Sequence, residues 1–192
     1  AARTLSDAAI AGMGHVDILI NNAGGSRSFK ELHVDEERWQ EAITLNFHRP
    51  RQVADALIDQ MIARKWGRII TSTTSGAIAP IKNLAISNTL RAALLAWSKT
   101  LASEVATDGI TVNIIMPGRV ATDRLRQLDE ARAKREGSSY EDVVKSSLQQ
   151  IPMGRYGDPK EYGDTAAFLA SQNASFITGT VIRVDGGQIQ AI

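Results

Sequence analysis

The stretch ITVNIIM, residues 110–116, runs directly into Pro117-Gly118, and it decides the fold class. Its side chains are almost all apolar or β-branched, without the alternation of a strand that has one wet face. Such a run is typical of a strand that is buried on both faces of a parallel sheet. Short runs rich in Ile and Val recur at residues 16–21, 68–73 and 180–185, and we predict that all four are strands.

Longer stretches of helical character separate these strands, at residues 35–65, 87–107 and 158–171. A charged stretch over residues 122–150 is also expected to be helical. The connections are too long for hairpins, so the strands should run parallel with helices on both faces. The expected fold is one α/β domain over residues 1–192, a doubly wound parallel sheet of the Rossmann type.

Local signals mark two of the helix ends. Asp158 stands where an N-cap is expected, with Pro159 next and Glu161 three residues after the cap, which predicts a capping box. Asp108-Gly109 is expected to end the central helix, because glycine supplies the left-handed residue after a helix.

Composition excludes several classes of protein. The net charge is +1, from 22 basic and 21 acidic residues, so the sequence lacks the basic footprint of a nucleic-acid binder. There is no cysteine, and His15, His33 and His48 lack any ligand spacing, so no structural metal is expected. No apolar run is long enough to cross a membrane, and no signal peptide is evident, so a cytoplasmic location is expected.

Three of the predicted strands run into loops rich in glycine, proline or hydroxyl groups. These loops are Asn22–Gly25, Thr74–Gly76 and Pro117–Arg119. Ligands of open parallel sheets bind beyond the carboxyl ends of the strands, and glycine lets a ligand approach the backbone. Any one of these loops could simply turn the chain, but three together predict a shared binding site.

Several motifs along the chain resemble those of the short-chain dehydrogenase/reductase family. They are DILINNAGG (17–25), GRII before a Ser/Thr cluster (67–75), TVNIIMPGRVATD (111–123), GRYGDPKEYGDTAAFLAS (154–171) and ITGTVIRVDGG (177–187). They cover nearly the whole chain in the order of the family. The resemblance implies a nicotinamide-dependent oxidation of alcohols or reduction of carbonyls.

The resemblance also implies which residues bind the cofactor, NAD or NADP. Along the adenosine part these are Asn22, Ala23 and Gly24; beside the nicotinamide they are Pro117, Gly118, Val120 and Thr122; and Arg91 would hold a ribose hydroxyl. The Thr122 hydroxyl can meet the carboxamide, and it can also cap the following helix. The choice between NAD and NADP stays open, because the selecting residue normally follows a strand that this sequence lacks.

The glycine-rich turn that opens the family's fold is not found in this sequence. Gly12-Met13-Gly14 lacks the third glycine and precedes a strand, so we interpret it as a helix terminus. About two βαβ units of roughly 30 residues each are expected to be missing, which would leave an apolar sheet edge exposed.

The catalytic residues of the family are a Tyr and a Lys one helical turn apart, assisted by a Ser and an Asn. At these positions the chain has Ser87, Arg91, Thr74 and Asn46. Thr73 or Ser72 replaces Thr74 if the loop differs by one residue. A serine hydroxyl is a far weaker acid than a phenol, and arginine does not exchange a proton near neutrality, so the acid/base pair is changed.

Other interpretations of these residues remain open. Ser87 would also serve as the cap of the central helix, and Arg91 as a surface or ion-pairing residue. The resemblance implies that the charged stretch over residues 122–150 is a lid that covers the substrate. Tyr140, in this lid, is the candidate to replace the missing phenol. Pro50 cannot donate to the carbonyl of Asn46, so a bent helix could hold a water for a proton relay, or could simply be kinked.

Two functions are compatible with the sequence. The first is an atypical oxidoreductase acting on a small alcohol or carbonyl substrate. The second is a protein of the same fold that has lost turnover and serves as a nucleotide-binding or assembly module. Ala92, Ala93 and Ala96 on the central helix indicate close approach by another helix, so a homodimer or homotetramer is expected in either case.

Overall fold

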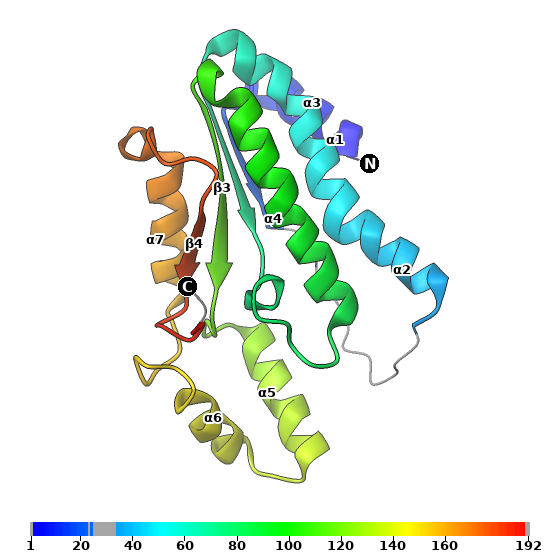
Figure 1. The fold of residues 1–192 in the computed structure, drawn as a ribbon, viewed down its shortest axis with the longest axis vertical. Helices are drawn as coiled ribbons and strands as arrows, with labels where there is room; N and C mark the ends of the chain where they lie inside the picture. Colours follow the sequence, from blue (N-terminus) through cyan, green and yellow to red (C-terminus); the bar gives the residue numbers. More distant parts are fainter. Residues whose placement is uncertain (1, 23, 25–33, 191–192) are drawn as a thin grey trace.

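The protein is described by a computed structural model covering residues 2–22, 24 and 34–190. Its sheet has the strands β1 (Ile18–Asn21), β2 (Gly67–Ser72), β3 (Ile110–Pro117) and β4 (Val181–Val184). They lie side by side in the order β1-β2-β3-β4, and each neighbouring pair is parallel (Figure 1). The four predicted strands and their parallel arrangement are therefore confirmed.

One helix precedes β1 in the described residues, and the others connect successive strands. The helices are α1 (Ala2–Met13), α2 (Glu36–Ile43), α3 (Arg49–Arg64), α4 (Ala85–Val105), α5 (Asp123–Glu136), α6 (Tyr140–Leu148) and α7 (Pro159–Ala170). In Figure 1, α3 and α4 lie on one side of the sheet and α7 lies on the other. Helices on both faces confirm the doubly wound arrangement.

Two apolar clusters hold these layers together. On the α3–α4 face, Ile69 and Val112 of the sheet pack with Leu57 and Met61 of α3 and with other buried residues of that face. On the α7 face, Ile70 and Ile115 pack with Leu169 and Ala174. Neighbouring strand residues point to opposite faces, so a strand with both faces covered must be apolar throughout.

The sheet edge at β1 is open among the described residues. Ile18 and Ile20 are 43% and 51% exposed, and β1 pairs only with β2 in the described part of the chain. The register places Ile20 beside Ile70, which belongs to the α7 face. An exposed apolar edge is what the sequence predicts here.

The local signals at helix ends are confirmed. Asp158 and Glu161 form both halves of the capping box at the start of α7. Gly109 follows the 3₁₀ turn that extends α4 and has a left-handed φ of 73°. Gly14, with φ 78°, ends α1, as the interpretation of residues 12–14 as a helix terminus requires.

The predicted helix over residues 35–65 contains a wide turn. Between α2 and α3, residues Thr44–His48 form a π-helical segment, and the amide of Arg49 donates to the carbonyl of Thr44 five residues earlier. Pro50 lies in the first turn of α3, directly after this segment, and has no amide hydrogen to donate. Wide turns of this kind occur frequently at functional sites, and this one is centred on Asn46.

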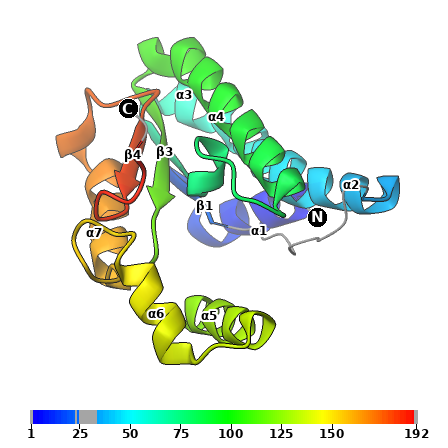
Figure 2. The ribbon, with the colours of Figure 1, turned by 60° about the horizontal axis from the view of Figure 1, so that its bottom comes forward.

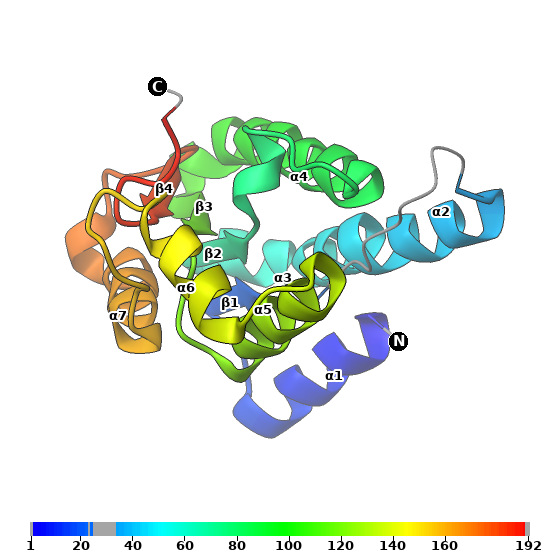
Figure 3. The ribbon, with the colours of Figure 1, turned by 90° about the horizontal axis from the view of Figure 1, so that it is seen from below.

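The segment predicted to be a lid forms α5 and α6. Both lie beyond the carboxyl ends of the strands, as the views in Figures 2 and 3 show. No helix within the described ranges is both long and apolar enough to span a membrane.

Candidate functional site

Three residues from different elements meet beyond the end of β1. A Cβ built on Gly24 would lie 2.7 Å from Nη2 of Arg91 and 2.9 Å from Oδ1 of Asn46. Gly24 has a φ of +116°, a conformation that other residues rarely adopt. The loop after β1, the wide turn and α4 therefore converge on one point, and two of the predicted catalytic residues lie there.

Arg91 is buried, with 8% of its surface exposed, so its interpretation as a surface residue is wrong. Its Nη1 donates to the carbonyl oxygen of Ser72 at 3.4 Å. Burial lowers the pKa of Arg91, and the nearby Tyr162 opposes that change. No carboxylate pairs with Arg91 among the described residues, so a buried positive charge faces the site without a counter-ion.

Ser87 does not cap the central helix. Helix α4 begins at Ala85, its N-cap is Leu84, and no side chain caps it. In the first turn, the carboxamide of Asn88 reaches back to Ile81: it accepts from the amide of Ile81 at 3.3 Å and donates to its carbonyl at 2.9 Å. Ser87 is thus inside the first turn and 9% exposed, one helical turn before Arg91.

Asn46 lies in the middle of the wide turn and is 1% exposed. Its Nδ2 donates to the carbonyl of Ala42 at 3.0 Å. That bond orients the carboxamide so that Oδ1 faces Gly24 and Arg91. The departure from a regular helix that Pro50 predicts is the wide turn just before it.

The hydroxyl groups at the end of β2 have different surroundings. The hydroxyl of Tyr162 donates to the carbonyl of Ile115 at 3.1 Å and lies 2.8 Å from Oγ of Ser72. A carbonyl only accepts, so the single phenolic proton goes there and Ser72 must donate to Tyr162. Ser72 is therefore engaged on the α7 face. Thr73 and Thr74 are left as candidates for the hydroxyl that binds substrate.

Thr73 and Thr74 differ in exposure. Thr73 is buried, and its hydroxyl has no hydrogen-bond partner within the described ranges. Thr74 is half-buried and has an extended backbone before a short 3₁₀ turn. Both lie next to Ser72, whose carbonyl contacts Arg91.

The loop after β3 carries the residues predicted beside the nicotinamide. The amide of Gly118 donates to Val184 at 3.0 Å, and a Cβ on Gly118 would lie 2.7 Å from Cα of Asp185. Val120 forms a β-bridge with Gly157. The Thr122 hydroxyl accepts from the amide of Leu125 and caps α5, so its predicted capping role is confirmed.

The remaining predicted residues are placed as follows. Asn22 follows β1 and is exposed. Ala23 lies outside the described residues. Pro117 is the last residue of β3, directly before Gly118. No group of three or more His, Asp or Glu side chains in the described ranges is placed to hold a metal ion.

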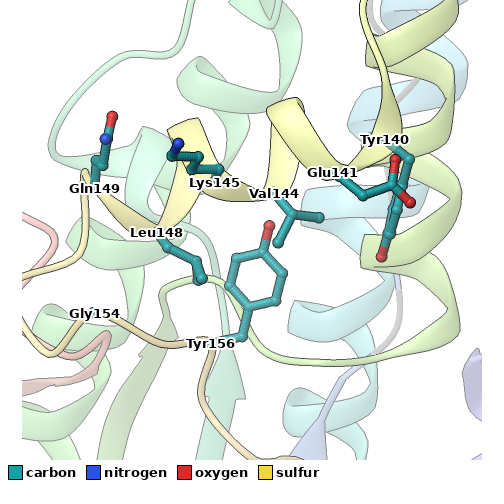
Figure 4. Close-up of a pocket in the computed structure, with 8 residues that line it drawn as sticks. All are labelled: Tyr140, Glu141, Val144, Lys145, Leu148, Gln149, Gly154 and Tyr156. Atoms are coloured by element: carbon teal, nitrogen blue, oxygen red, sulfur yellow. The ribbon is translucent and has the colours of Figure 1, made fainter.

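The sequence makes Tyr140 the candidate to replace the missing phenol. It begins α6 and lines an apolar groove of about 650 Å³ with Val144, Leu148 and Tyr156 (Figure 4). The phenol that interacts electrostatically with Arg91 is Tyr162. Burial raises the pKa of Tyr162, while Ser72 and Arg91 act in the opposite direction, so this phenol stays protonated near neutrality.

Packing alone does not account for the tyrosines of the GRYGDPKEYG stretch. Tyr162 stands four and seven residues before Ala166 and Leu169, on the helix face that packs against the sheet. A phenol on such a face needs a hydrogen-bond partner. The position of Tyr162 on the apolar face of α7 could therefore have predicted a buried hydrogen bond of its hydroxyl. The partner of the Tyr162 hydroxyl, Ser72, lies on β2, far away in the sequence. The sequence alone therefore did not identify this partner.

The chain is similar to known proteins over most of its length. Residues 1–188 match a family model described as Enoyl-(Acyl carrier protein) reductase. The 3-oxoacyl-[acyl-carrier-protein] reductase FabG of Escherichia coli K12 is 37% identical over 177 residues, covering 91% of this chain and 67% of that protein. Nodulation protein G of Azospirillum brasilense is 32% identical over 177 residues, covering 92% of the chain and 68% of that protein.

Solved structures of similar proteins have the same fold. YwfH, an NADPH-dependent reductase involved in bacilysin biosynthesis, is 30% identical with a TM-score of 0.93, covering 100% of this chain and 74% of that one. The L-sorbose reductase of Gluconobacter frateurii, complexed with NADPH and L-sorbose, is 30% identical with a TM-score of 0.92, covering 100% of this chain and 73% of that one. The match along the whole chain, joined to the strand order and the convergence at Gly24, shows that this chain belongs to the short-chain dehydrogenase/reductase family.

Proposed function

We propose that the chain is an NADPH-dependent oxidoreductase that reduces a carbonyl group of a small molecule or oxidises the corresponding alcohol. The observation that carries this proposal is the meeting of Arg91 and Asn46 at Gly24, beyond the carboxyl ends of the strands. Ligands of such sheets bind at this edge. NADPH is chosen because two structural relatives are described with it.

The residues present fit a dinucleotide. A Cβ on Gly118 would meet the backbone of Asp185, and a Cβ on Gly24 would meet the ends of the Arg91 and Asn46 side chains. Glycine in both loops lets a ligand approach the backbone closely. Arg91 places a positive charge inside the site, and its partner among the described residues is a carbonyl. A buried charge is costly without a polar partner, and the ribose hydroxyls of the cofactor would provide one.

The nicotinamide, when bound, would supply or accept the hydride. Thr74 and Ser87 would hold the carbonyl or hydroxyl oxygen of the substrate by hydrogen bonds. Arg91 would fix the ribose and stabilise negative charge that develops on that oxygen. Arg91 keeps its proton near neutrality, so its contribution is electrostatic.

The proton must come from another group, because the Ser87 hydroxyl is a weak acid. Asn46 and the wide turn lie beside Arg91 and would order a water that delivers it. The segment Thr44–His48 departs from the regular α-helical hydrogen-bond pattern, as helical segments at functional sites frequently do. The lid, α5 and α6, would cover the substrate.

The direct test is to incubate the purified protein with NADPH and a panel of ketones, quinones and 3-oxoacyl thioesters. Loss of absorbance at the nicotinamide band is expected for at least one class. Ser87→Ala should lower kcat about tenfold, the value of one hydrogen bond of about 1.4 kcal/mol. Ser87→Tyr with Arg91→Lys then measures whether the usual acid/base pair raises the rate.

If the protein binds NADPH without turnover on any substrate class, the proposal is wrong. The alternative, a nucleotide-binding or assembly module, would then be favoured. Titration of the protein with NADPH, followed by fluorescence, shows whether it binds the nucleotide at all.

Gly24→Ala is expected to raise the Kd for NADPH at least tenfold. The new Cβ would displace the Arg91 guanidinium and the Asn46 carboxamide, and the backbone would be strained at its positive φ by about 1 kcal/mol or more. Fluorescence titration measures the Kd. Gly163→Ala in α7 is the matched control, since its Cβ meets nothing within 4 Å, and unchanged binding in Gly24→Ala would contradict the expectation.

A further inference from the structure

A buried carboxylate joins the lid to the loop beside the proposed nicotinamide site. Asp129 is in the middle of α5 and is 1% exposed. Nη1 of Arg119 donates to its Oδ1 at 2.9 Å, and the hydroxyl of Tyr156 donates to its Oδ2 at 2.8 Å. Each carboxylate oxygen therefore has a donor from a different segment of the chain.

The two donors are also joined to each other through the backbone. The amide of Gly157 donates to the carbonyl of Arg119, and the amide of Ala121 donates to the carbonyl of Gly157, both at 2.9 Å. Arg119 is flanked by Gly118 and Val120, which were predicted to lie beside the nicotinamide. Asp129 thus contacts that loop and the loop before α7 at once.

This contact differs from the other ion pairs of the lid. Arg126–Glu130 and Arg132–Glu136 are four residues apart on α5 and have carboxylates that are 47% and 44% exposed. Exposed pairs of this kind contribute little to stability. Asp129 is enclosed, and a buried charge that loses a partner is strongly destabilising. Movement of α5 would break both of its bonds.

The geometry points to Asp129 as a positioning residue that couples the lid to the loop Pro117–Thr122. While Arg119 and Tyr156 hold its carboxylate, α5 and the loop keep one relative position. When the contact breaks, both should become mobile together. The effect on turnover rests on the proposed function, but the coupling is measurable without it.

Hydrogen exchange measured by mass spectrometry on the full chain tests the coupling. Asp129→Asn should speed exchange about 100-fold in residues 123–148 and equally at the amides of Gly118 and Ala121. Tyr156→Phe, which removes one of the two donors, should speed exchange about tenfold in the same residues. Glu130→Gln is the matched control, because it removes a 3.0 Å ion pair from the same helix without contact with the loop, and it should change neither region.

The result that would overturn the coupling is faster exchange in the lid with wild-type protection at Gly118 and Ala121. Faster exchange in β2 and α4 as well would show that Asp129→Asn destabilises the whole protein. In that case the coupling is judged from Tyr156→Phe, which supports it if exchange rises in the lid and at Gly118 and Ala121 alone. Arg119→Gln combined with Asp129→Asn should recover part of the lost protection, since two amides can bond without a charge.

A kinetic measurement connects the coupling to the proposed activity. Asp129→Asn should raise the KM and the Kd for NADPH about tenfold, while Glu130→Gln leaves both at wild-type values. Unchanged constants together with the exchange pattern above would contradict a role in cofactor positioning. Failure of the wild-type protein to bind NADPH would contradict the proposed function, and the exchange experiment would still decide the coupling.

Discussion

Arg91→Met is expected to lower kcat/KM about 1,000-fold. The substitution keeps a long side chain and removes a buried positive charge that lies beside Asn46 and Gly24. Loss of one preorganised group that stabilises developing charge costs about 10² to 10³ in rate, and the ribose contact would be lost with it. Steady-state kinetics with varied NADPH and varied carbonyl substrate measures the change.

A lysine at this position keeps the charge but is shorter. Arg91→Lys should therefore retain more activity than Arg91→Met, with a higher KM for NADPH. Arg51→Met is the matched control, because Arg51 pairs with Asp55 on α3 away from Gly24. Wild-type kcat/KM in Arg91→Met would show that Arg91 serves the fold alone.

Arg68→Leu is expected to reduce the free energy of unfolding by about 3 kcal/mol. Arg68 is 1% exposed, and its guanidinium donates to the carbonyls of Gly67, Gly109 and Ser171 at 2.8, 3.3 and 3.3 Å. It also lies 4.5 Å from the centre of the Trp66 ring. Leucine would fill part of the space but leave these carbonyls without their donor.

Calorimetry or urea unfolding followed by circular dichroism measures the loss. The melting temperature should fall by about 10 °C for a chain of this size. Arg64→Leu is the comparison, because Arg64 is 48% exposed and pairs with Asp17 at 2.9 Å, so it should cost less than about 1 kcal/mol. Equal losses of the free energy of unfolding in the two variants would show that the buried Arg68 contributes no more to stability than an exposed arginine.

The strands could be predicted from sequence because burial on both faces leaves few alternatives for a short apolar run. Residues 110–116 form β3 almost to the residue. The start of α7 and the end of α4 were equally predictable. A capping box and a C-terminal glycine depend only on residues that are close in the sequence. The oligomeric state stays a prediction.

The misassigned features depend on contacts beyond the immediate neighbours of a residue. Ser87 has the residue type of a cap, but Asn88 holds Ile81 and the helix begins before it. The charged stretch after Thr122 indicates a solvated surface, and one of its carboxylates is nevertheless the buried Asp129. Local composition cannot show which member of a charged stretch has partners elsewhere.

The contact of Gly118 with β4 has a consequence for biosynthesis. The amide of Gly118 donates to the carbonyl of Val184, and Asp185 lies so close to Gly118 that a Cβ there would clash with it. Chains emerge from the ribosome in sequence order. The loop after β3 therefore cannot make these contacts until the strand that follows α7 has been synthesised, and a nascent chain that is stalled before Val181 would lack the proposed nicotinamide site in its final shape.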